Sequence, residues 1–280
     1  MNTGPLGVLF GLVSALVWGS GDFSGGVATR RSHPYVVLAA ATFAGMAMLL
    51  VFAPLRGEPA PTASTAFWAA LSGVFGILGI GSLYRALASG SAVQVAPTAG
   101  VVGALLPVLF TLITRGLPGG TQMAGFAVAL PGIWLVSRSP AQPQAAPSRG
   151  FWLAVLAGCG FGGFFITIAQ VDPGTLFIPL VVSKLVSFCL TLLILLRLRV
   201  RPFTLHAPPA AWLAGLLDAG GNIFFLLATQ LTRLDVATVL ASLYPAATVL
   251  LAYWVLREKI APAQWAGLVL CLAAVAFIAL

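Results

Sequence analysis

Ten apolar runs dominate this chain, and short stretches rich in proline, glycine or charge separate them. Each run has about 20 residues, the length at which a helix crosses a hydrocarbon core of about 30 Å. We therefore predict ten membrane-spanning helices, at about residues 6–27, 34–54, 67–88, 91–113, 120–137, 151–170, 175–196, 210–230, 235–256 and 261–280.

The composition excludes a soluble globule. Hydrophobic residues make up 60% of the 280 residues and charged residues only 7%, whereas about a quarter of an ordinary soluble domain is charged. The formal net charge is +8, but the basic residues lie mostly between the apolar runs, which argues against nucleic acid as a partner and favours lipid headgroups. No basic region precedes the first run, so we expect it to remain as a span and not to be removed as a signal peptide.

The chain divides at its midpoint. The stretch from Arg138 to Arg149 is polar and contains three prolines, which prevents a continuous helix. We predict a first five-helix half at 1–137, a linker at 138–150 and a second five-helix half at 151–280. Because five is an odd number, the two halves must enter the membrane in opposite directions, which makes an all-α fold with an inverted repeat.

A constant offset of 142 residues supports this repeat. It superimposes, without gaps, six pairs of identical residues: Gly73 and Gly215, Gly79 and Gly221, Ala86 and Ala228, Arg115 and Arg257, Gln122 and Gln264, and Gly125 and Gly267. The linked set at 115–125 and 257–267 carries the most weight. The halves are not equivalent everywhere, because Gly103 matches Pro245 and Gly116 matches Glu258.

Basic residues in the short loops indicate an orientation. Nine follow odd-numbered spans: Arg30, Arg31, Arg138, Arg149, Arg197, Arg199, Arg201, Arg257 and Lys259. Three follow even-numbered spans: Arg56, Arg115 and Arg233. This bias favours cytoplasmic odd loops and places both termini outside.

Ionisable residues inside the spans are the first candidates for function, because a charge at mid-bilayer costs about 2.5–3.5 kcal/mol on insertion scales. Lys184 is either a fixed cation for a substrate carboxylate or a structural lysine. Asp218 and Asn222, four residues apart, share a helix face. Asp218 is either a proton-titrating or amine-binding residue or a structural partner, and its depth permits an ion pair with Lys184.

Five other polar or aromatic residues are candidates for lining a binding site. Trp18 and Asp22 share a face of the first span. Asp22 either serves a cavity or is interfacial beside Arg30 and Arg31, and Trp18 either stacks on a ligand or packs, with packing favoured. Tyr84 lies at the end of the third span and Gln94 at the start of the fourth, near the same membrane surface. They either line the mouth of a cavity or are simply interfacial residues. Tyr244 precedes Pro245 at mid-span, a combination that favours an inward position.

The first span, ALVWGSGDFSGG at 15–26, and the repeated ends at 114–132 and 256–274 resemble EamA-type permeases of the drug/metabolite transporter superfamily. Amino-acid exporters of the YddG type are the most similar branch. The resemblance covers both halves. It implies helices arranged as a basket around a central cavity, with the second and seventh spans outside, and it implies cytoplasmic termini, against the charge bias.

Together these features predict a secondary transporter that moves small organic solutes by alternating access. We expect export of amino acids or related metabolites across a bacterial inner membrane, by a monomer with no metal or cofactor, either coupled to protons or by facilitated diffusion. Import or antiport of sugars or nucleotide sugars is the alternative within transport. An integral-membrane enzyme or scaffold is the alternative from another class, although the chain has no GxSxG, HExxH or nucleotide-binding motif.

Overall fold

The computed structural model describes residues 4–88, 92–138, 149–200 and 207–280. These residues form helices and no strand: α1 (Pro5–Thr29), α2 (Pro34–Arg56), α3 (Ala63–Ala88), α4 (Ala92–Arg115), α5 (Gly120–Ser137), α6 (Arg149–Ile168), α7 (Phe177–Arg197), α8 (Pro209–Leu231), α9 (Leu234–Ala241), α10 (Tyr244–Leu256) and α11 (Pro262–Ala279). They make ten spans that are long and apolar enough to cross a membrane, which confirms the all-α prediction.

The ninth span is broken, contrary to the single helix predicted at 235–256. Helix α9 ends at Ala241 and α10 begins at Tyr244. Pro245 has no N–H to donate to the carbonyl of Ala241, and the N–H of Leu243 bonds the carbonyl of Leu240 at 3.2 Å, one residue short of the α-helical pattern. In the first half, where Gly103 holds the position equivalent to Pro245, α4 continues without a break.

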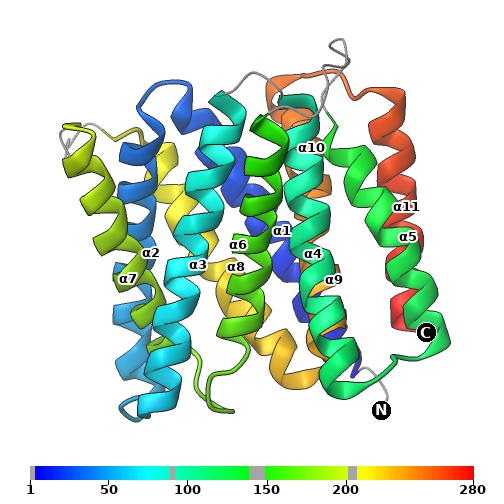
Figure 1. Ribbon diagram of the computed structural model, residues 1–280, viewed down its shortest axis with the longest axis horizontal. Coiled ribbons are helices and arrows are strands. Elements are labelled where there is room, and N and C mark those ends of the chain that lie inside the picture. Colours follow the sequence, from blue (N-terminus) through cyan, green and yellow to red (C-terminus); the bar gives the residue numbers. More distant parts are fainter. Residues whose placement is uncertain (1–3, 89–91, 139–148, 201–206) are drawn as a thin grey trace.

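The helices form one bundle whose two ends are built differently (Figure 1). Helices α2, α7 and α3 lie toward one end, the pair α5 and α11 closes the other, and α1, α4, α6, α8 and α9 lie between them. The start of α1 and the end of α11 lie on one face, which we call the termini side (Figure 1). The opposite face, where α5 ends and α6 begins, is the linker side.

The repeat seen in the sequence recurs in the packing. Gly73 of α3 lies against the carbonyl of Ser183 in α7, where a Cβ atom would not fit. The equivalent Gly215 of α8 lies in the same way against the carbonyl of Ala41 in α2, and Ala41 is the residue that the 142-residue offset pairs with Ser183. The two halves therefore contact each other through equivalent surfaces.

The glutamines and glycines of the linked set have a structural explanation. Gly125 of α5 packs against Ala274 and Ile278 of α11, and Gly267 of α11 packs against the equivalent residues of α5. Three residues before each glycine, Gln122 and Gln264 accept a hydrogen bond from the backbone N–H before their helix, at 3.4 and 2.9 Å. Each glutamine thus satisfies a donor that a helix start leaves free.

On the termini side, one carboxylate fixes the start of α7. Glu58, in the loop after α2, has a side chain that is only 3% exposed. It accepts hydrogen bonds of 2.9 to 3.1 Å from the N–H groups of Leu176, Phe177 and Ile178. A negative charge here complements both the free N–H groups and the positive end of the helix dipole.

Candidate functional site

Asp218 of α8 is the centre of a polar group inside the helix bundle. Its Oδ2 pairs with Lys184 Nζ of α7, and its Oδ1 accepts a hydrogen bond from Asn222 Nδ2 at 3.2 Å. Its backbone carbonyl also accepts from Trp18 Nε1 of α1 at 3.2 Å. The ion pair between Lys184 and Asp218, which their similar depth in the membrane permits, is therefore present. Through these contacts Asp218 connects α1, α7 and α8.

The orientation of α8 directs this carboxylate to the interior. At 3.6 residues per turn, Gly215 and Gly221 lie about 60° to either side of Asp218. Gly215 packs on α2 and Gly221 on the indole of Trp18, whereas the exposed Leu216 lies on the opposite face. The Asp218 side chain is nevertheless 45% exposed, whereas that of Lys184 is 15% exposed.

Asp22 of α1 faces the same region. On one side of it, about 60° around the helix, Gly19 packs against the Tyr244 carbonyl and Ala247 of α10. On the other side, about 40° away, Trp18 packs inward. Asp22 is itself exposed and lies within electrostatic range of Asp218 and Tyr244. The structure thus brings Asp22 near residues of α8 and α10, and its role in a cavity stays a prediction.

Tyr244 lies where the ninth span is broken. It is half-buried, is the first residue of α10, and its carbonyl approaches Gly19. The Thr248 hydroxyl donates to the Gly19 carbonyl at 3.0 Å, which holds α10 against α1. The tyrosine, Asp22, Lys184, Asp218 and Asn222 together form what we call the polar hub.

The side chains of Tyr84 and Gln94 lie outside the described part of the structure. Their backbones belong to the end of α3 and the start of α4, on the linker side. Their predicted role at a cavity mouth therefore stays a prediction.

Three aromatic rings lie next to the polar hub. Trp18 contacts Phe165 of α6 and Phe225 of α8, each at a centroid distance of 5.6 Å, and the two phenylalanines lie 4.9 Å apart. Phe225 is seven residues beyond Asp218, about 10 Å nearer the termini side. Trp18 packs on both phenylalanine rings, and the aromatic cluster lies beside the hub. A role of Trp18 in stacking on a ligand stays a prediction.

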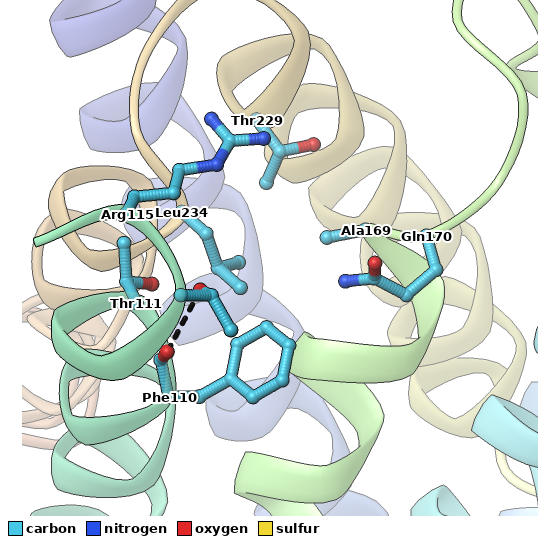
Figure 2. Close-up of a pocket in the computed structure, with 8 residues that line it drawn as sticks. Phe110, Thr111, Arg115, Ala169, Gln170, Thr229 and Leu234 are labelled. Carbon is cyan, nitrogen blue, oxygen red and sulfur yellow. Dashed lines mark hydrogen bonds between the residues drawn. The ribbon is translucent and has the colours of Figure 1, made fainter.

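Beyond the aromatic cluster, a pocket of about 210 Å³ opens on the termini side. It lies among the ends of α4, α6 and α8 and the start of α9. Figure 2 shows Arg115, at the end of α4, and Gln170, in the turn after α6, on different sides of it. Its lining residues are Phe110, Thr111, Thr114, Arg115, Ala169, Gln170, Thr229 and Leu234. Sequence reasoning placed Arg115 in a loop and did not find this pocket, because its walls come from helix ends far apart in the chain.

A buried ion pair beside this pocket was also missed. Asp235, at the start of α9, is buried, and it accepts three hydrogen bonds from Arg233, at 3.1 and 3.2 Å from Nε and at 2.8 Å from Nη2. Arg233 also donates to the Gly116 carbonyl at 2.8 Å. An acidic residue in the first turn of a predicted helix is the signal that would have indicated the pair.

Comparisons with known proteins place these features in context. The model of a family described as the EamA-like transporter family matches residues 5–138 and again residues 148–280. No curated protein matches the chain. A solved structure described only as "Crystal structure of protein" matches with a TM-score of 0.70 at 20% sequence identity, over 98% of this chain and 96% of that chain. At this identity the likeness shows the fold alone.

Proposed function

Because this chain belongs to the EamA-like transporter family, we propose that it is a secondary transporter that exports amino acids or related metabolites by alternating access. The polar hub is the observation that carries the proposal. It lies between α1 of the first half and α7, α8 and α10 of the second, and transporters built from inverted repeats bind substrate at such an interface, near a discontinuous helix.

The charges of the hub suit a small zwitterion. With all three groups ionised, Asp22, Asp218 and Lys184 give the hub one net negative charge. A substrate ammonium group would bind between the two aspartates, while Lys184 would exchange its partner Asp218 for the substrate carboxylate. A charge-assisted contact of this kind is worth about 1.5–3 kcal/mol.

We place the protein in a bacterial inner membrane as a monomer, with lipid as its surroundings and its linker side in the cytoplasm. The charge bias supports this orientation, since nine basic residues follow odd-numbered spans of the sequence and only three follow even-numbered ones. Coupling to protons would act through Asp22 or Asp218, and facilitated diffusion is the alternative.

The first prediction concerns Asp218. In proteoliposomes loaded with labelled amino acids, with and without a pH gradient, Asp218→Asn should reduce efflux at least about tenfold, because the variant loses a charge-assisted contact. Glu258→Gln is the matched control, since it makes the same chemical change in an exposed pair with Arg30. Efflux and pH dependence unchanged in Asp218→Asn would remove the hub from the mechanism. Transport of sugars in place of amino acids would select the alternative cargo.

A further inference from the structure

The termini-side pocket lies on the same path as the polar hub. Asp218, Phe225 and Thr229 are seven and then four residues apart, so they share one face of α8. Phe225, in the aromatic cluster, therefore separates the hub carboxylate from the pocket hydroxyl. A solute that leaves the hub toward the termini side meets the pocket next.

The walls of this pocket present oxygen acceptors. The hydroxyl of Thr114 donates to the Phe110 carbonyl at 2.8 Å, and that of Thr229 donates to the Leu226 carbonyl at 2.8 Å. A hydroxyl has one proton, so these oxygens have only lone pairs left for a ligand. Gln170 uses its Nε2 on the Ile166 carbonyl at 2.9 Å, which leaves its Oε1 as a further acceptor.

One cation stands beside these acceptors. Arg115 is exposed at the end of α4, and among the described residues no carboxylate pairs with it. The nearby acid, Asp235, is already bound by Arg233. The Arg115 guanidinium therefore offers a fork of N–H donors that matches a carboxylate.

From this arrangement we propose that the pocket is a second binding site, which takes a zwitterionic amino acid. Its carboxylate would bind Arg115, and its ammonium group would donate to the oxygens of Thr114, Thr229 and Gln170. A simple anion would leave these acceptors unused, and a simple amine would meet the charge of Arg115. The volume of about 210 Å³ equals the room of about seven waters, which fits an amino acid with a short side chain.

This inference rests on the proposed function for its cargo, but its test does not require transport. Ala169 lines the pocket without a polar group, so Ala169→Cys places a thiol there and leaves the ligand contacts intact. Cys159, which is half-buried, and Cys189, which is exposed, are replaced by alanine, and the buried Cys271 is kept. The rate of modification by a small thiol reagent is then measured in detergent.

L-valine should slow this modification, whereas isobutylamine, which lacks the carboxylate, and isovalerate, which lacks the amine, should not at the same concentration. Arg115→Gln should raise the L-valine concentration needed for half protection by about tenfold. Arg30→Gln, the matched change on the linker side, should leave it unaltered. If Ala169→Cys does not fold, Leu234→Cys provides a second thiol on the pocket wall.

Asp218→Asn separates the two sites. Protection by L-valine that persists in this variant supports a pocket distinct from the hub, and protection lost together with the hub carboxylate overturns it. Equal protection by isovalerate or isobutylamine, or none by L-valine, also overturns the proposal. Protection without amino-acid transport would reject the proposed function alone, and transport without protection would reject the second site alone.

Discussion

At the level of single residues, Glu58 supports more structure than its place in a loop suggests. Its buried carboxylate holds three N–H groups at the start of α7, more than 100 residues further along the chain. Glu58→Gln puts an amide donor against these donors, so we expect a loss of about 2 kcal/mol in the free energy of unfolding. Thermal unfolding in detergent measures this, with Glu258→Gln as the exposed control. Equal midpoints for the two variants would contradict the capping role.

Asp172, in the loop between α6 and α7, gives a prediction for pH. Hydrogen bonds from the side chains of Thr62 and Thr65 hold its pKa below the ordinary value of an aspartate. Since the folded pKa is the lower one, the stabilisation is present above the unfolded pKa and is lost as the pH falls through the folded pKa. The carboxyl pKa, followed by NMR, should rise in Thr62→Val. An unchanged pKa would show that the Thr62 bond, at 2.6 Å, has no influence.

At the level of helices, glycine sets how closely the halves approach. Gly215→Ala would place a methyl group on the Ala41 carbonyl, a backbone atom that cannot turn away. Overpacking of this kind costs about 1–3 kcal/mol, so we expect a lower unfolding temperature. Gly26→Ala, also within a helix but with open space around it, should be neutral or slightly stabilising. A Gly215→Ala protein as stable as Gly26→Ala would mean that the α2–α8 contact is loose.

The break between α9 and α10 could not be predicted from the sequence. Pro245 at mid-span indicated an irregularity, but α4 contains Pro97 and Pro107 and stays continuous. A missing N–H weakens a helix, and whether the helix then breaks depends on the neighbours that pack around it. Here Gly19 allows the Tyr244 carbonyl to come close to α1, a contact that no local pattern in either segment encodes.

For the whole molecule, the hydrophobic runs predicted the ten spans, because the thickness of the bilayer sets the length of each run. The 142-residue offset predicted the repeat, because equivalent positions of two symmetric halves keep the same residues. The ion pair between Lys184 and Asp218 could be predicted, because counting residues along the two helices places both side chains at a similar depth. The pocket around Arg115 and the Glu58 cap were not, since each joins groups that only the tertiary fold brings together. The substrate roles of the hub residues stay predictions.

The orientation can be tested on the intact molecule. A cysteine at Arg30 or at Thr62 would report the linker side and the termini side, in a background without Cys159 and Cys189. We expect a membrane-impermeant thiol reagent to label Thr62→Cys from outside intact cells and to label Arg30→Cys only after the membrane is opened. The reverse pattern would favour the cytoplasmic termini that the family resemblance implies.

The reciprocal glycine contacts also bear on how the protein is made. Helices α1 and α3 pack chiefly on α8 and α6, which belong to the other half and leave the ribosome later. During synthesis the first five spans are therefore inserted into the lipid before their partners in the second half exist, and their glycine-containing contact surfaces stay exposed to lipid. A chain cut between residues 138 and 149 should accumulate only when both pieces are made together, each acting as the scaffold on which the other matures.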